Sequence, residues 1–164
     1  MKEILLSVKP KCCELISKRE KTVVVRKTKP KLDTPFKVYI YCTNDSEGDL
    51  FMRTGNKFLG YHCESLQGKV IGEFVCDSIE RVNDYIPNEL YEYGINKTLY
   101  AWHISALLIY SRPKELKEFK NNRSCYYDHL GLATPKCKDC KGYQVVEPPK
   151  NWCYVESEVQ EDDR

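Results

Sequence analysis

The stretch Lys-Arg-Glu-Lys-Thr-Val-Val-Val-Arg-Lys, residues 18–27, places three valines between Lys21 and Arg26. Consecutive β-branched residues favour a strand. In a strand Thr22, Val24 and Arg26 share one face, while Lys21 stands at the start, where its side chain can turn either way. Arg26 can bind a phosphate or carboxylate through two bonds and Lys21 can supply a point charge. This strand is therefore expected to line a cavity for an anionic or nucleotide-like ligand.

Hydrophobic patterning and turn residues predict several strands and one early helix in the rest of the chain. Pro10 fits the first turn of a helix that ends near Arg19. Strands are expected at 4–8, 21–27, 36–43, 68–79, 101–105, 107–110 and 151–156, short helical pieces at 87–93 and 114–119, and a long loop at 44–68. Strands without regular β-α alternation favour an α+β fold, a mixed β-barrel with short peripheral helices.

Gly72 and Glu73 lie in the middle of the strand expected at 68–79. A glycine inside a strand indicates a bulge or the close approach of a ligand or another backbone. A carboxylate in mid-strand needs solvent or a partner. Arg26 or Lys21 is the natural partner of Glu73, so the three charged side chains could line one pocket.

Composition indicates one globular domain with an appendage, because 164 residues that are 41% apolar can bury a substantial core. No stretch approaches the ~20 apolar residues of a membrane span, and the N-terminal apolar run is too short for a signal peptide, so we expect a cytoplasmic protein. Residues 1–31 hold ten Lys or Arg and three Glu, a net +7, whereas residues 156–164 sum to −4. The basic front can attract phosphates, or it is an ordinary solvated face.

Four segments together resemble the ASCH domain family: Ile-Leu-Leu-Ser-Val-Lys-Pro at 4–10, the Lys-x-x-x-x-Arg strand, Gly-Lys-Val-Ile-Gly-Glu-Phe at 68–74 and Trp-His-Ile-Ser at 102–105. That family has a PUA-like β-barrel, is linked to RNA, and includes proposed RNA binders and enzymes. The resemblance implies an ASCH/PUA-like barrel core over residues 1–112. The remainder, 113–164, resembles the tail of short phage- or prophage-borne members. It is expected as a cysteine-rich extension that returns a final strand, about 151–156, to the barrel and ends in an acidic tail.

The signature of the family reads Gly-x-Lys-x-x-Glu-x-Arg. Lys21 and Arg26 match it, Arg19 takes the place of the glycine, and Val24 replaces the glutamate. In the amidohydrolase branch, which acts on an acetylated cytidine, a lysine, a threonine and a glutamate form the catalytic set. Val24 stands in the place of that threonine, and an aliphatic side chain cannot attack a carbonyl.

The resemblance and the basic strand lead to three functional hypotheses. The first is a protein that binds RNA or a modified nucleotide in a basic cavity, with bases stacked on aromatic rings. The second is a hydrolase: an acetylcytidine amidohydrolase that uses Lys21 and Glu73 with Thr22 as the substitute nucleophile, or a ribonuclease that uses Lys21, Arg26 and a tyrosine. The third is a phage-borne protein that binds a host protein inside a bacterial or phage-infected cell. The cavity residues expected under the first hypothesis are Lys21, Arg26, Glu73, Tyr39, Tyr41 and Trp102.

The environment of Val24 tests the first two hypotheses, which both need a ligand cavity, against the third. A closed, apolar environment around it would argue against both ligand hypotheses, whereas an open polar cavity would support them. Because the polar signature residue is missing at Val24, we expect binding rather than catalysis.

Nine cysteines are an odd and high count for a chain without a signal peptide. No cofactor is required by the hypotheses above, but the spacing Cys-x11-Cys-x2-Cys-x12-Cys includes a Cys-x2-Cys knuckle that tetrahedral zinc accepts. His129 is a replacement ligand for the last cysteine, and free reduced thiols are the alternative. The candidate ligands of a structural zinc are Cys125, Cys137, Cys140 and Cys153.

Overall fold

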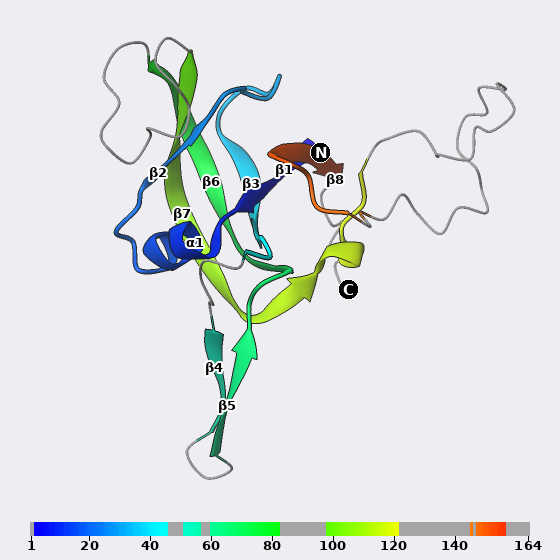
Figure 1. Cartoon of the computed structure of the whole chain (residues 1–164). Coiled ribbons are helices and arrows are strands. Elements are labelled where there is room, and N and C mark those ends of the chain that lie inside the picture. Colours follow the sequence, from blue (N-terminus) through cyan, green and yellow to red (C-terminus); the bar gives the residue numbers. More distant parts are fainter. Residues whose placement is uncertain are drawn as a thin grey trace, which may run out of the picture.

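The computed structural model describes residues 2–45, 51–56, 60–82, 98–121, 145 and 147–156. Within these residues six strands form one sheet in the order β2-β7-β6-β3-β1-β8, and two further strands form a separate hairpin (Figure 1). The elements are β1 (Lys2–Val8), α1 (Pro10–Ser17), β2 (Val23–Arg26), β3 (Phe36–Cys42), β4 (Phe51–Asn56), β5 (Gly60–Ser65), β6 (Lys69–Val82), β7 (Leu99–Glu115), a 3₁₀ helix (Leu116–Glu118) and β8 (Trp152–Glu156).

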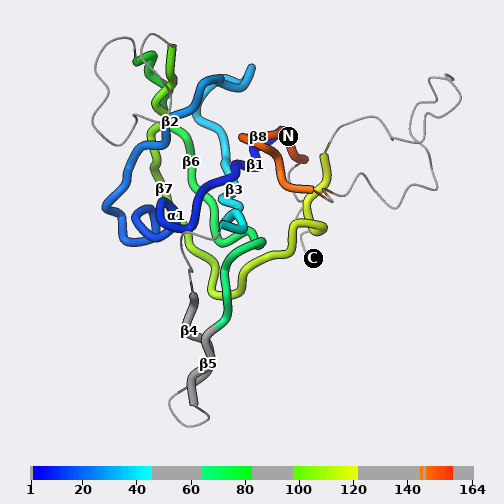
Figure 2. Tube along the Cα trace, viewed as in Figure 1, coloured from blue at the N-terminus to red at the C-terminus, as the bar shows by residue number. Residues whose placement is uncertain are grey.

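The sheet is mixed, as the sequence predicts. Its central strands β1 and β3 run parallel, with Ile4 opposite Val38 and Val8 opposite Cys42. The other neighbouring strands of the sheet pair antiparallel. β8 lies along the outer side of β1, so two segments from opposite ends of the chain run side by side (Figure 2).

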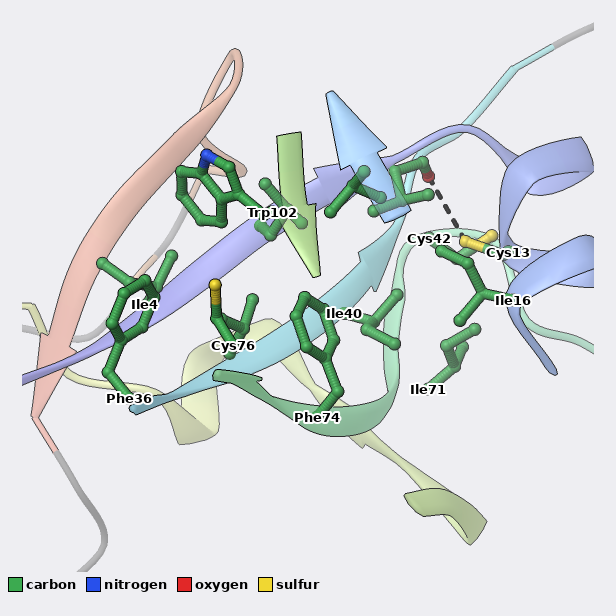
Figure 3. Close-up of a cluster of buried hydrophobic side chains, with 14 of the residues drawn as sticks. Ile4, Cys13, Ile16, Phe36, Ile40, Cys42, Ile71, Phe74, Cys76 and Trp102 are labelled. Atoms are coloured by element: carbon green, nitrogen blue, oxygen red, sulfur yellow. Dashed lines mark hydrogen bonds between the residues drawn. The ribbon is translucent and has the colours of Figure 1, made fainter. Parts of the chain in front are cut away.

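Both faces of the sheet are buried against hydrophobic clusters. The helix-side cluster, shown in Figure 3, packs under α1 and contains Ile4, Leu6, Val8, Cys13, Ile16, Val24, Phe36, Val38, Ile40, Cys42, Leu66, Ile71, Phe74, Cys76 and Trp102. The tail-side cluster lies around the 3₁₀ helix and contains Leu5, Tyr39, Tyr41, Val70, Phe119, Val145 and Val155. Successive residues of β1 and β3 alternate between the two clusters, as the period of a strand requires.

Helix α1 ends at a left-handed residue. The amide of Glu20 donates to the Leu15 carbonyl and that of Arg19 donates to the Ile16 carbonyl, both at 2.9 Å. These are the two bonds of a Schellman motif, which places a left-handed residue, most often glycine, after the helix. Arg19 fills that position with φ 61°, and its side chain donates to the Leu107 carbonyl at 3.3 Å. The left-handed backbone agrees with the glycine of the family signature, although this chain carries an arginine there.

The long β6–β7 pair is irregular where Gly72 lies. The register shifts between Val70 and Gly72 and again between Glu73 and Val75. A Cβ built on Gly72 would lie 2.4 Å from the Leu108 carbonyl oxygen and 3.1 Å from the Ile109 Cα. The sequence prediction of a bulge or close backbone approach at Gly72 is therefore confirmed, and the approaching group is strand β7.

Several predicted elements differ from the structure. The segment 44–68, expected as a loop, contains the hairpin of β4 and β5, which leaves the sheet as a separate ribbon (Figure 1). The two strands expected at 101–105 and 107–110 are one strand, β7, which also crosses the expected end of the barrel core at residue 112. The helical piece at 114–119 is the short 3₁₀ helix, and the one at 87–93 lies outside the described residues.

Within the described ranges, no helix is long and apolar enough to cross a membrane.

Replacing Arg19 with glycine is expected to raise the free energy of unfolding by about 0.5–1 kcal/mol. Glycine adopts a positive φ without a Cβ clash, and its larger unfolded-state entropy offsets only part of that gain. Urea unfolding followed by circular dichroism measures the change. Arg19→Ala is the matched control, because it keeps the Cβ and loses only the bond to Leu107. A glycine variant less stable than the alanine variant would show that residue 19 carries no strain.

Replacing Gly72 with alanine is expected to lower the free energy of unfolding by about 1–3 kcal/mol, because the new methyl group must displace the β7 backbone. Ser78→Ala, an exposed position of the same strand, is the control and should change stability by less than about 0.5 kcal/mol. Equal stability of the two variants would contradict the close packing of β6 on β7.

Candidate functional site

Val24 lies in a closed, apolar environment. Its side chain is 1% exposed and belongs to the helix-side cluster, directly opposite Trp102 in the β2–β7 pair. The polar signature position is therefore occupied by a core residue. This geometry argues against both ligand hypotheses in the form given above, in which the ligand occupies a cavity lined by the strand of Val24, so a binding site has to be sought elsewhere on the molecule.

Arg26 uses its guanidinium group to hold β2 against β1. Nη2 donates to the Ser7 carbonyl and Nη1 to the Val25 carbonyl, both at 2.8 Å. The side chain is partly buried, and Lys21 at the other end of the stretch is partly exposed. These two bonds give Arg26 a structural role at the junction of β1 and β2.

Glu73 lies on the opposite face of the sheet from Val24, where it forms a hydrogen bond and an ion pair. Its Oε2 accepts a hydrogen bond from the Tyr110 hydroxyl at 2.5 Å, and its Oε1 lies 3.4 Å from the Lys37 Nζ. The prediction that Lys21 or Arg26 is its partner is therefore wrong. Lys37 takes that place because β3 pairs directly with β6.

A second carboxylate, Glu3, extends this network. Glu3 is 7% exposed, accepts a hydrogen bond from the Tyr39 hydroxyl at 2.6 Å and lies 4.0 Å from the Lys37 Nζ. Lys37 therefore lies between the two carboxylates, and each carboxylate accepts a hydrogen bond from one tyrosine hydroxyl. Such a network satisfies buried charges and ties β1, β3, β6 and β7 together.

The three aromatic residues predicted to stack on a base are buried. Tyr39 is 3%, Tyr41 4% and Trp102 0% exposed. Burial raises the pKa of the Tyr41 phenol. A base cannot stack on rings that the sheet already covers, so these residues do not form the predicted stacking platform.

The buried cysteines behave as core residues. Cys13 donates to the Val8 carbonyl at 3.5 Å. Its hydrogen bond with Cys42 raises the pKa of the Cys13 thiol well above its usual value and lowers the pKa of Cys42. Burial raises the pKa of Cys76 to about 11. The raised pKa values make Cys13 and Cys76 poor nucleophiles, and burial keeps Cys42 from reactants in solution.

Three of the four predicted zinc ligands, Cys125, Cys137 and Cys140, lie outside the described residues, as does His129. Cys153 lies in β8 and packs against the tail-side cluster. Over the described ranges, His, Cys, Asp and Glu side chains form no group that could hold a metal. The zinc site stays a prediction.

Partly exposed aromatic rings gather where β8 meets the connection from β2 to β3. We call this the lysine–aromatic surface and define it by Lys29, Lys31, Tyr100, Trp152 and Tyr154. The three rings are partly exposed and the two lysines exposed. The Trp152 and Tyr154 rings meet edge to face, with centroids 5.4 Å apart. Lys29 Nζ lies 5.9 Å from the centre of the Tyr100 ring.

Two hydrogen bonds tether the connection to β8 at this surface. The Trp152 Nε1 donates to the Thr28 hydroxyl at 3.0 Å, and the Lys31 amide donates to the Tyr154 hydroxyl at 2.7 Å. Lys2 adds a further cation 5.7 Å from the Tyr154 ring centre. These contacts hold the basic segment beside the rings of β8.

A concave region lies where β5, β6 and the end of β7 meet. It has a volume of about 660 Å³ and is lined by Glu64, Lys69, Arg112, Pro113, Lys114, Glu115 and Glu118. Lys69 pairs with Glu64 and lies 3.7 Å from Glu115. Three cations and three carboxylates line it, so its charges balance, whereas the segment 27–31 carries three lysines and no acid. The lysine–aromatic surface is the better anion site.

The sequence reasoning did not include Tyr100, Trp152 and Tyr154 among the site residues. One feature of the sequence could have pointed to two of them. Trp152 and Tyr154 alternate with Cys153 and Val155, so a strand over these residues places both rings on one face. What the pattern lacks is the pairing of β8 with β1, which brings that face to the basic segment.

Replacing Tyr39 with phenylalanine is expected to lower the free energy of unfolding by about 1.5–3 kcal/mol, because it removes the donor from a carboxylate that is 7% exposed. Tyr110→Phe is the matched control: it removes the same hydroxyl from Glu73, whose side chain is 22% exposed, and should cost less. Chemical unfolding of both variants measures the difference. If Tyr110→Phe lowered the free energy of unfolding more than Tyr39→Phe, a water molecule would be donating to Glu3 in place of the lost hydroxyl, contrary to the prediction.

No family model matches the chain, and no curated protein matches it. Among solved structures, the ASCH protein of Zymomonas mobilis is similar, with a TM-score of 0.57 at 15% identity over 95% of this chain and 89% of that chain. A tyrosine-to-phenylalanine variant of that protein gives a TM-score of 0.57 at 14% identity, covering 94% of this chain and 91% of the other. The serine-to-alanine variant gives 0.56 at 15% identity, with 94% and 89% covered. This chain therefore has the fold of the ASCH domain, a PUA-like β-barrel.

Proposed function

We propose that this protein binds single-stranded RNA on the lysine–aromatic surface and performs no hydrolysis. The observation that carries the proposal is the contact of three partly exposed rings with a lysine-rich segment. Aromatic rings stack bases and lysines neutralise phosphates, and the two together are the recurring means of binding a single strand.

The charge around the surface supports the proposal. Residues 27–31, Lys-Thr-Lys-Pro-Lys, carry three cations without an acid, and Lys2 contacts the same Tyr154 ring. A strand of nucleic acid that follows these lysines can lay bases on Trp152 and Tyr154. The ASCH-type fold adds support for RNA over single-stranded DNA, because the family that the sequence resembles is linked to RNA.

The placement of the predicted catalytic residues does not support the hydrolase alternative. Val24 is a core residue, and Glu73 is bonded to Tyr110 and Lys37 on the other face of the sheet. Lys21, Thr22 and Glu73 therefore do not make the nucleophile, base and oxyanion arrangement that acyl transfer needs. The contacts favour binding over turnover.

Charge reversal at Lys29 and Lys31 together is expected to weaken the binding of an RNA oligomer of about eight uridines by at least about tenfold at low salt. For a single strand, each phosphate contact contributes about −0.7 to the slope of log K against log salt concentration. Loss of two contacts should therefore make the slope about 1.4 less negative. Fluorescence anisotropy at several salt concentrations measures both quantities.

The matched control reverses Arg112 and Lys117, two exposed cations at the end of β7 and in the 3₁₀ helix. It changes the net charge by the same amount and should leave the salt slope unchanged. Equal losses in both double variants would mean that only net charge matters. Failure of the unmodified chain to bind any single-stranded oligomer at low salt would contradict the proposal and favour the host-protein alternative.

A further inference from the structure

Trp102 carries a polar atom that the fold leaves unpaired. The residue is 0% exposed, and its indole Nε1 has no hydrogen-bond partner among the described residues. The ring packs edge-on against Phe36, with centroids 5.9 Å apart, and tilted against Trp152 at 6.0 Å. In Figure 3 the indole nitrogen lies on the side of the ring away from Phe36 and Cys76.

A buried N–H group of this kind calls for an acceptor. Native proteins pair nearly all buried polar atoms, either within the chain, with water or with a ligand. Indole is a donor only, so the missing partner has to be an acceptor such as an oxygen atom.

The surroundings of Trp102 lead to the lysine–aromatic surface. Trp152 contacts both the buried Trp102 ring and the partly exposed Tyr154 ring, so the three rings form one connected series from the surface to the core. Arg26 follows Val24 on the face of β2 that meets Trp102, and its bond to Ser7 keeps a positive charge at this end. An oxygen that carries partial negative charge fits this environment best.

We propose that a nucleobase bound on the lysine–aromatic surface places a carbonyl oxygen against the Trp102 Nε1. The proposal rests on the RNA-binding function proposed above. Trp152 packs on the Trp102 ring from the edge strand β8 and is partly exposed, so its side chain has to turn aside, with loss of its bond to Thr28, to admit the base. Uracil, cytosine and guanine carry carbonyl oxygens and adenine does not. The site therefore prefers uridine-rich over adenosine-rich strands.

The chain has two tryptophans, so the indole N–H region of its ¹⁵N spectrum holds two signals, which Trp152→Phe assigns. Saturation with an oligomer of eight uridines is expected to move the Trp102 signal downfield and to slow its exchange with water. A Trp102 signal that stays in place while anisotropy reports saturated binding overturns the inference and leaves RNA binding intact. Absence of binding by anisotropy overturns the proposed function as well.

An isosteric replacement tests the same contact without altering packing. β-(3-Benzothienyl)alanine at Trp102 exchanges the N–H for sulfur and keeps the shape of the ring system. It is expected to weaken uridine-oligomer binding about tenfold, to abolish the preference over the adenosine oligomer, and to leave the melting temperature unchanged or higher. The same replacement at Trp152, which loses only the bond to Thr28, is the control and should retain the base preference. An unchanged preference in the Trp102 variant overturns the inference.

Discussion

Burial on both sides of the central parallel pair is the constraint on which the rest of the structure depends. β1 and β3 lie between two hydrophobic clusters, and their side chains alternate between them. A side chain cannot cross the sheet, and a shift of one residue would exchange the two faces. The alternation sends Val24 and Trp102 to the helix side and Tyr39 and Glu73 to the tail side. The separation of the predicted site residues follows directly from it.

The polar groups obey the same constraint. Glu3 and Glu73 face the tail-side cluster, where burial requires partners, and each finds a tyrosine hydroxyl and the ammonium group of Lys37. Removal of the lysine would leave two carboxylates close together without a cation, a costly arrangement. These side chains therefore act in folding, although Glu73 is a candidate catalytic residue by sequence.

The early helix, most strands and the mixed sheet could be predicted from the sequence because they depend on local periodicity, on proline and on glycine. The bulge at Gly72 was predictable for the same reason. The partner of Glu73 was not, because it depends on which strands become neighbours, and Lys37 lies 36 positions away in sequence. The hairpin at 51–65 was missed because a polar, glycine-bearing segment fits a loop equally well. The rings of β8 were not predicted as site residues because their position depends on the pairing of β8 with β1, two segments from opposite ends of the chain.

The choice between binding and catalysis turns on what the two ends of the signature strand do. In an enzyme of this type the polar residue between Lys21 and Arg26 would carry the chemistry, whereas here Val24 fills the core and Arg26 bonds to backbone carbonyls of two strands. The strand that the sequence predicts to line a cavity is therefore packed against the core through Val24. Its basic continuation, 27–31, leaves the sheet and meets the aromatic rings of β8, which places positive charge beside stacking surface. A surface of this composition suits the single strand proposed above, and the indole N–H of Trp102, which has no hydrogen-bond partner among the described residues, is the donor that we propose this strand contacts.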